Sequence, residues 1–336
     1  MQVLQGEYNA VTARCGPIES WLTQRKLAKD PEDSEYHASS DRAASPRATA
    51  DRNDRRGVCM RSVIWVSAVY LLALGGLADM ARADVVRYVR YADGDAVSYG
   101  IEEGDSVRQL SAAPWNGGQA TGRTVRRADV RLLAPAEPSK VIAVGYNYKS
   151  HRGDRELPAH PPIFLKLPTA IIGPDEAVVY PAGATDLHYE AELVVVIGKT
   201  AKQVSPGQAG EYIFGITAGN DVSERAWQAN DLQWFRAKAS DTFGPLGPAI
   251  VTGLNHNDLL VESRLNGEVK QSQRTRDLIH NVEAIVSHVS QTVTLYPGDI
   301  IYTGTPGSTS AMQPGDVIEI EVEGVGVLRN HIVDGR

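Results

Sequence analysis

The stretch Tyr189-Glu190-Ala191-Glu192-Leu193-Val194-Val195-Val196-Ile197 carries two acidic residues directly ahead of a continuous apolar run. In an extended strand successive side chains alternate between faces, so Glu190 and Glu192 point the same way. The run Val194–Ile197 has no polar side, which is typical of a strand covered on both faces. Two carboxylates near an apolar interior repel each other and lose hydration unless a cation lies between them. A divalent ion that prefers oxygen ligands, such as Mg²⁺, Mn²⁺ or Ca²⁺, is the simplest such cation.

The composition is that of an ordinary globular enzyme. The chain has 336 residues, of which 42% are hydrophobic and 22% are charged, and its formal net charge is -7. This acidic balance argues against nucleic acid or an anionic membrane as a partner.

The first 83 residues differ from the rest. Residues 1–59 lack a sustained apolar period and are rich in polar and small residues, so we interpret them as a disordered or untranslated extension. Residues 60–83 combine a basic start, sixteen uncharged residues and the ending Ala81-Arg82-Ala83, which predicts a signal peptide cleaved after Ala83. The alternatives are a membrane anchor or a buried helix. If the start at Met60 is used, the protein is exported or periplasmic with no stable membrane insertion after processing; otherwise it is cytoplasmic.

Both cysteines lie in this leading part of the chain. Cys15 and Cys59 precede Met60, so a processed chain contains no cysteine. Disulfides, thiolate catalysis and a cysteine zinc site are thereby excluded for the processed protein.

The remaining chain indicates an α+β fold dominated by strands, with few helices. Residues 84–135 predict a small β-rich N-terminal subdomain, with a hairpin at Asp93-Gly94. Residues 136–336 predict the main domain, with a second hairpin at Asn266-Gly267. One helix is expected from Leu278 onward with Asp277 as its cap, and another near Ser223. Apolar runs predict strands at Val141–Val144, Ile163–Leu165, Leu193–Ile197, Tyr212–Ala218, Ala249–Val251, Asp299–Thr303 and Val317–Val322.

A third acidic residue follows the strand predicted at Tyr212–Ala218. Asp221 is placed where it could complete a metal site with Glu190 and Glu192. Its spacing from Glu224 also fits a capping box, in which Asp221 would cap a helix instead. In a further alternative, nearby basic residues such as Arg225 and Lys238 neutralise the glutamates as ion pairs.

An ordered series of motifs resembles the fumarylacetoacetate hydrolase family across about residues 84–333. The motifs are Gly145-Tyr146-Asn147-Tyr148, His151, Phe164-Leu165-Lys166, Tyr189-Glu190-Ala191-Glu192-Leu193, Gly219-Asn220-Asp221-Val222-Ser223, Arg236-Ala237-Lys238, Asp241-Thr242-Phe243-Gly244-Pro245 and Thr303-Gly304-Thr305-Pro306-Gly307. The resemblance implies a mixed β-roll, usually a homodimer. It also implies Mg²⁺ or Mn²⁺ held by Glu190, Glu192 and Asp221, and activity on small 2-oxo acids and β-dicarbonyls.

Several polar residues then become candidates for the substrate site. Lys238 could place a positive charge where an oxyanion grows, or form a salt bridge to the glutamates. Lys166 could meet the substrate carboxylate, or be an ion-paired lysine. Thr305 could bind a carboxylate from a Gly-rich turn, or merely belong to a β-turn. Arg225 and Gln228 are further polar candidates on the helix after Asp221.

His151 bears on the type of reaction. Hydrolytic members of the family place a histidine here as general base, oriented by a Glu three residues later, and a histidine titrates near working pH. In this chain the residue at that spacing is Asp154, so Asp154 is the expected partner. The alternative is a histidine exposed on a loop.

Three functions are compatible with these residues. The first is a metal-dependent hydrolase that cleaves a C–C bond of an acylpyruvate or β-dicarbonyl through a metal-stabilised enolate. The second is a decarboxylase or an isomerase of an unsaturated 2-oxo-dioate, of the 2-hydroxyhepta-2,4-diene-1,7-dioate isomerase type. The third is an exported, non-catalytic protein that binds oxo acids.

Overall fold

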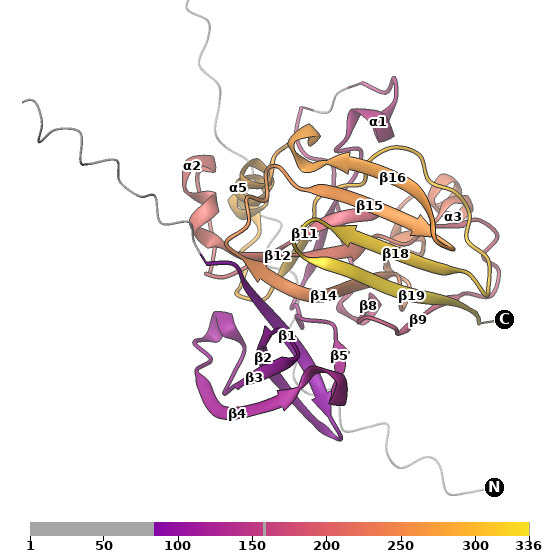
Figure 1. The fold of residues 1–336 in the computed structure, drawn as a ribbon. Helices are drawn as coiled ribbons and strands as arrows, with labels where there is room; N and C mark the ends of the chain where they lie inside the picture. Colours follow the sequence, from indigo (N-terminus) through magenta and orange to yellow (C-terminus); the bar gives the residue numbers. More distant parts are fainter. Residues whose placement is uncertain (1–83, 157–158, 336) are drawn as a thin grey trace, which may run out of the picture. The chain divides into compact units, whose positions relative to one another are not determined.

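The computed structural model of the protein describes residues 84–156 and 159–335, and Figure 1 shows their fold. The extension predicted at 1–59, the signal peptide predicted at 60–83 and both cysteines lie outside the described residues. None of the helices in the described ranges combines the length and apolarity needed to span a membrane.

The N-terminal strands form an antiparallel meander. The predicted hairpin at Asp93-Gly94 is confirmed, because Asp93 pairs with Ala96 and Gly94 has the positive φ of 59° that a tight turn requires. The first strand also pairs with the catalytic part of the chain, where Val86 lies opposite Thr252. The elements are β1 (Val86–Asp93), β2 (Ala96–Glu103), β3 (Ser106–Leu110), η1 (Pro114–Asn116), β4 (Ala120–Arg126), η2 (Arg127–Asp129) and β5 (Arg131–Leu133).

The meander is continuous with a large mixed sheet. Within the described residues this sheet has twelve strands in the order β4-β3-β2-β1-β14-β12-β11-β17-β6-β7, with β5 paired to β1 and β8 paired to β14. Every residue of β11 is buried, as the unbroken apolar run predicted. The further strands are β6 (Val141–Val144), β7 (Ile163–Lys166), β8 (Ile171–Ile172), β11 (Ala191–Ile197), β12 (Ile213–Asn220), β14 (Gly244–Thr252) and β17 (Ile300–Tyr302).

A second sheet lies over β11, β12 and β14 (Figure 1, orange to yellow), and the main hydrophobic core fills the space between the two sheets. Its order is β16-β15-β18-β19-β9, with β9 and β19 parallel. The predicted turn at Asn266-Gly267 is confirmed, and both residues have positive φ. The elements are β9 (Ala177–Tyr180), β15 (Leu260–Leu265), β16 (Glu268–Arg274), β18 (Val317–Val322) and β19 (Gly326–Asp334), while β10 (Leu187–His188) and β13 (Ser223–Glu224) form a separate pair.

Helices are few and short, which confirms the strand-dominated α+β fold. The predicted start of the longest helix is wrong, because Asn281 and not Asp277 caps it: the Asn281 side chain accepts a hydrogen bond from Ala284 N–H. Leu278 therefore lies outside the helix. The elements are α1 (Lys149–Arg152), η3 (Pro168–Ala170), α2 (Pro206–Ala209), η4 (Gly210–Tyr212), α3 (Arg225–Asn230), α4 (Phe235–Ala239), η5 (Thr275–Asp277) and α5 (Val282–Thr292).

Candidate metal and active site

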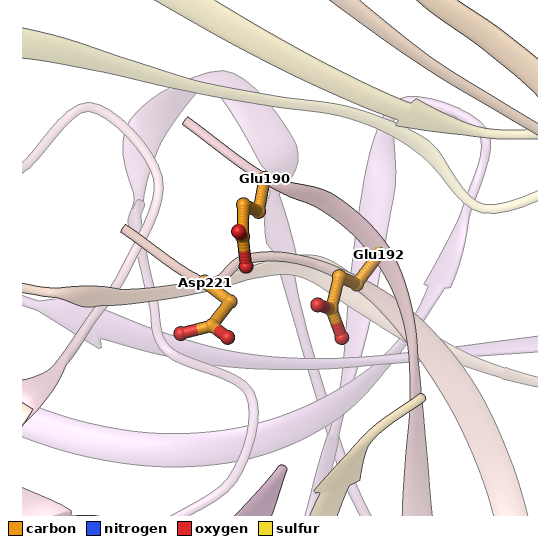
Figure 2. A group of neighbouring side chains, drawn as sticks. All are labelled: Glu190, Glu192 and Asp221. Atoms are coloured by element: carbon orange, nitrogen blue, oxygen red, sulfur yellow. The ribbon is translucent and has the colours of Figure 1, made fainter. Parts of the chain in front are cut away.

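Three carboxylates meet where β11 begins and the neighbouring strand β12 ends. Ala191 pairs with Asn220, so Glu190 lies beside Asp221, whose backbone N–H donates to the Glu190 carbonyl at 2.9 Å. Glu192 projects from the same side of β11 as Glu190. Figure 2 shows the three carboxyl groups gathered in one place, and one ligand oxygen from each lies within 4.8 Å of the others. All three residues are buried.

Asp221 does not cap the helix that follows it. The cap of α3 is Glu224, whose carboxylate accepts hydrogen bonds from the backbone of Trp227, Thr185 and Asp186. The Asp221 carboxylate is thereby left for the buried acidic cluster. The structure thus supports the metal-site interpretation of Asp221 over the capping-box alternative.

Three cations neutralise two of the three carboxylates. The Lys238 ammonium bridges Glu190 at 2.6 Å and Asp221 at 2.8 Å. Lys166 lies 2.5 Å from the second oxygen of Asp221, and Arg225 lies 2.6 Å from the second oxygen of Glu190. The ion-pair alternative therefore holds for Glu190 and Asp221.

Glu192 is the exception. Its carboxylate accepts a 2.7 Å hydrogen bond from Gly304 N–H, and in the described part of the chain it forms no ion pair. A buried carboxylate without a cation is unfavourable. Three clustered carboxylates, one of them uncompensated, are the hard oxygen ligands that a divalent ion of the Mg²⁺ or Mn²⁺ class prefers. The donor set therefore fits such an ion.

The pKa directions of the two glutamates follow from these contacts. Burial raises the pKa of Glu190, but the charges of Lys238 and Arg225 lower it by more, so its pKa lies well below the usual range. Burial raises the pKa of Glu192 well above its usual value, and the neighbouring charges of Asp221 and Glu190 act in the same direction. Lys238 and Arg225 thus keep Glu190 ionised, whereas Glu192 has no cation that would favour its ionised form in the described residues.

The two lysines also differ. Burial lowers the pKa of Lys238, but Asp221 and Glu190 outweigh burial and raise it overall. Burial lowers the pKa of Lys166, and the attraction of Asp221 offsets this only in part.

Lys238 and Lys166 also occupy different places. Lys238 lines the pocket in front of the acidic cluster. Lys166 is not among the pocket residues; its side chain is fully buried, with its ammonium against Asp221 and the backbone carbonyls of Val222 and Lys238. The geometry favours the ion-paired alternative for Lys166, and substrate contact by Lys166 stays a prediction.

His151 reaches the cluster from α1, at the edge of the same pocket. Its Nδ1 lies 2.8 Å from the Gly307 carbonyl, and its Nε2 lies 3.7 Å from Glu190 Oε1. A carbonyl oxygen can only accept, so Nδ1 donates the hydrogen of this bond, and Nε2 is the ring nitrogen that faces the carboxylates. His151 is therefore not the exposed loop histidine of the alternative interpretation.

Asp154 does not orient this ring. It is exposed, and in the described residues no hydrogen bond or ion pair joins it to His151. The Gly307 carbonyl, and not the Asp154 carboxylate, accepts the hydrogen bond from His151 Nδ1. The reason is that the turn after α1 directs Asp154 to solvent, while the Thr303–Gly307 loop approaches the imidazole from the other side.

The remaining candidates, Thr305, Gln228 and Arg225, form hydrogen bonds to other groups of the protein. Thr305 lines the pocket, but its hydroxyl donates to the Ala191 carbonyl at 2.9 Å and accepts from Gln271 at 2.9 Å. Gln228 lines the pocket and accepts a 2.7 Å hydrogen bond from Arg225. These contacts fix the positions of the groups around the acidic cluster, and their contact with substrate stays a prediction.

The sequence analysis did not assign roles to several residues of the site. Tyr146, Phe164 and Trp234 form an aromatic wall of the pocket, and Gly304 supplies the hydrogen bond to Glu192. Tyr146 and Gly304 stand in the quoted motifs, and Gly304 directly after a predicted strand was a usable signal for a special backbone position. Nothing in the sequence distinguishes Trp234.

Two family models match the chain. One, described as fumarylacetoacetate (FAA) hydrolase C-terminal, matches residues 140–333, and one described as Rv2993c-like, N-terminal, matches residues 86–135. Together they span both the meander and the part of the chain that carries the acidic cluster.

Named relatives carry out more than one type of reaction. The mitochondrial oxaloacetate tautomerase FAHD2A of Bos taurus is 39% identical over 242 residues, which are 64% of this chain and 77% of that protein. The structure of 2-hydroxyhepta-2,4-diene-1,7-dioate isomerase from Mycobacterium marinum is 44% identical with a TM-score of 0.70, covering 74% of this chain and 99% of that one. The structure of maleylpyruvate hydrolase from Sphingobium sp. SYK-6, in complex with manganese(II) ion and pyruvate, is 29% identical with a TM-score of 0.62, covering 74% and 100%.

The family match extends over more than half of the chain and includes every residue of the acidic cluster and its cations. The sheets, the buried triad and the ordered motifs agree with it. The protein belongs to the fumarylacetoacetate hydrolase family of enzymes.

Proposed function

We propose that the protein is a divalent-metal-dependent isomerase that moves a proton between carbon and oxygen in a 2-oxo dicarboxylate. The candidate substrates are oxaloacetate and unsaturated 2-oxo dioates, the compounds named for the bovine tautomerase and the mycobacterial isomerase. The observation that carries the proposal is that His151 Nε2 points at the buried acidic cluster, while Asp154, at the position of the orienting Glu of hydrolytic family members, does not contact the ring in the described residues.

Glu190, Glu192 and Asp221 would hold the ion, with Mg²⁺ and Mn²⁺ the first candidates and Ca²⁺ a third. When bound, such an ion supplies Lewis acidity that stabilises negative charge on the oxygen of the 2-oxo group. The manganese in the maleylpyruvate hydrolase structure supports this choice of metal class.

His151 is the proposed proton carrier. Its Nε2 takes the proton from the carbon next to the 2-oxo group; the C–H bond breaks, a C=C bond forms, and the carbonyl electron pair moves to oxygen. The hydrogen bond from Nδ1 to Gly307 keeps the ring in the tautomer that can accept this proton. Return of the proton to oxygen, or to a different carbon, completes an isomerisation without cleaving a C–C bond.

Lys238 is the proposed partner of the developing oxyanion. An ammonium group has three N–H donors, and Glu190 and Asp221 take two of them. The third is free to approach an oxygen in the pocket that Lys238 lines. A positive charge held in place before the reaction stabilises negative charge that develops there.

The second candidate function is hydrolysis of an acylpyruvate-type C–C bond. His151 would then take a proton from water, which attacks a carbonyl carbon. The similarity to maleylpyruvate hydrolase favours this candidate. Against it, Asp154, which stands where the hydrolytic members of the family have the Glu that orients this histidine, is exposed and, within the described residues, forms no hydrogen bond or ion pair with His151.

Product identification separates the candidates. The full chain is incubated with Mg²⁺ or Mn²⁺ and a panel of oxaloacetate, 2-oxo dioates and acylpyruvates, with EDTA as the control. Loss of enol absorbance without new fragments in the NMR spectrum is expected. Release of pyruvate and a second acid in equal amounts would replace the isomerase by the hydrolase, and binding without turnover would leave an oxo-acid-binding protein.

Two further proposals concern the protein as a whole. Export after cleavage at Ala83 is tested by N-terminal sequencing of the secreted protein, which should begin at Asp84. A homodimer is tested by light scattering coupled to size exclusion, which should give twice the mass of the chain.

A further inference from the structure

Aromatic rings line the pocket beside its charged groups, with Lys238 Nζ 5.0 Å from the centre of the Phe164 ring. The Tyr146 and Trp234 rings meet edge to face at 5.9 Å, and Trp234 meets Phe164 in the same way at 5.4 Å. Tyr146 also stacks on the His151 imidazole, with 6.5 Å between ring centres. A substrate held at the carboxylates and His151 must therefore extend along an aromatic surface.

Tyr146 is held in an unusual backbone conformation. Its φ is 53°, which residues with side chains rarely adopt. Both neighbours are tied down: Gly145 N–H donates to the Pro162 carbonyl, and the Asn147 amide donates to the Thr303 and His280 carbonyls. Strained residues that the surroundings hold in this way concentrate at ligand sites. The hydrogen bonds of Gly145 and Asn147 therefore hold the Tyr146 backbone in the conformation that directs the ring into the pocket.

A cation lies next to this aromatic side, against Tyr146 and outside the residues that line the pocket itself. The guanidinium carbon of Arg155 is 4.9 Å from the centre of the Tyr146 ring, a cation–π contact. Within the described residues, its guanidinium donates one hydrogen bond, to the Arg152 carbonyl at 3.3 Å, and forms no ion pair, not even with the adjacent Asp154 and Glu156. Arg155 therefore keeps most of its five donors available.

The cations at the acidic cluster already have carboxylate partners. Lys166, Lys238 and Arg225 are each bound to Glu190, to Asp221 or to both. A substrate with a carboxylate at each end needs a cation for its far end as well. Arg155 lies against the aromatic wall, and in the described part of the chain no carboxylate is paired with its charge.

We propose that Arg155 and Tyr146 form a second anion-binding subsite, which holds the far carboxylate of a 2-oxo dicarboxylate while its oxo-acid end lies at the acidic cluster. This inference rests on the proposed function and extends it, because it makes Arg155 the residue that selects dianionic over monoanionic 2-oxo acids. Arg155 is fitted to this role because guanidinium binds carboxylate with two parallel N–H donors.

Calorimetric binding to the Mn²⁺-loaded full chain tests the subsite without requiring turnover. The two probes are 2-oxoadipate and 2-oxohexanoate, which have equally long chains and differ in the far carboxylate. The wild type is expected to bind the dianion more tightly. Arg155→Gln should weaken binding of the dianion by about 10- to 100-fold, the effect of losing one charge-assisted contact, and leave the monoanion unchanged. Arg155→Lys should restore part of the preference.

Lys149→Gln is the matched control. Lys149 is an exposed cation on α1, only six positions away in the chain, and the cation–π contact to Tyr146 is made by Arg155 and not by Lys149. Its loss should change binding of either probe by less than about twofold, as expected for a solvated surface charge. A similar loss in both variants would mean that general attraction, and not a subsite, favours the dianion.

The outcomes separate this inference from the proposed function. If neither probe binds to the wild type, the proposed function fails and the subsite fails with it. If both probes bind and Arg155→Gln leaves their affinity ratio unchanged, the subsite alone is overturned. Circular dichroism of each variant confirms that the exposed substitutions leave the fold intact.

Discussion

Replacing Glu192 with glutamine isolates the one uncompensated charge of the acidic cluster. The Glu192 side chain is 1% exposed and has one hydrogen-bond donor, Gly304 N–H. Glutamine has almost the same shape and keeps an oxygen for Gly304. The substitution therefore removes the charge and leaves the packing in place.

The effect on stability depends on pH. In the metal-free protein, burial and the charges of Asp221 and Glu190 raise the pKa of Glu192 above its ordinary value of 4.5 in the unfolded chain. Between these two pKa values the folded protein keeps a proton that the unfolded chain has released. The free energy of unfolding therefore falls as pH rises, by at most about 1.4 kcal/mol per pH unit for one proton.

Glu190 contributes with the opposite sign. Its lowered pKa stabilises the folded protein above pH 4.5, and this stability is lost as the pH falls through the folded-state pKa. The two glutamates thus act in separate pH ranges. Above pH 4.5 other groups such as His188, whose pKa is lowered by burial, also contribute, so the difference between the wild type and Glu192→Gln is what reports on Glu192.

The assay is urea unfolding in EDTA at several pH values from roughly 5 to 8. The wild type should lose stability relative to Glu192→Gln as pH rises, and Glu211→Gln, at an exposed position, should follow the wild type. Added Mn²⁺ should stabilise the wild type more than Glu192→Gln, because the ion binds the folded protein through the carboxylate. Parallel curves for the wild type and Glu192→Gln in EDTA would refute the argument that Glu192 is a buried acid without a compensating charge.

Three further substitutions test other parts of the structure. His151→Ala should lower the isomerisation rate by about 100-fold or more while Mn²⁺ binding by calorimetry persists, and unchanged turnover would remove His151 as proton carrier. Gly304→Ala should lower the free energy of unfolding, measured in urea, by about 2–4 kcal/mol. The new Cβ would lie 2.6 Å from Asn147 Cβ, and the φ of 110° is unfavourable for alanine. A loss well below this range would show that the loop moves to relieve the clash. Asn281→Ala should cost about 1 kcal/mol because α5 loses its cap, whereas Asn281→Asp should restore most of it, and equal melting of both variants would count against the cap.

Local patterns were sufficient for the central buried strand and for two tight turns, but not for strands such as β9 and β19, which the sequence analysis did not predict. The apolar run after Glu192 predicts a strand buried on both faces, and the structure buries every residue of β11. Asp93-Gly94 and Asn266-Gly267 predict hairpins that the structure contains. These predictions succeed because alternation and turn chemistry depend on residues close together in the chain.

The limits of local patterns are visible at the helices. Asp277 and Asn281 are both good caps four residues apart, and the apolar period alone does not choose between them. Similarly, Asp221 and Glu224 both fit the start of α3, and the structure assigns the cap to Glu224. Tertiary contacts decide such cases. The Asp221 carboxylate forms ion pairs with Lys166 and Lys238 in the interior and is therefore not available to cap the helix.

The sequence by itself determined the strand that presents Glu190 and Glu192 on one side, because side-chain alternation is a property of the strand alone. Which charges meet those carboxylates was decided only by the tertiary structure: strand pairing places Asp221 beside Glu190, and Lys238 comes from α4 to bridge them. The Gly307 carbonyl behind His151 has the same origin, since the two residues are 156 positions apart. Contacts over such separations depend on how the sheets assemble, and no spacing within a motif encodes them.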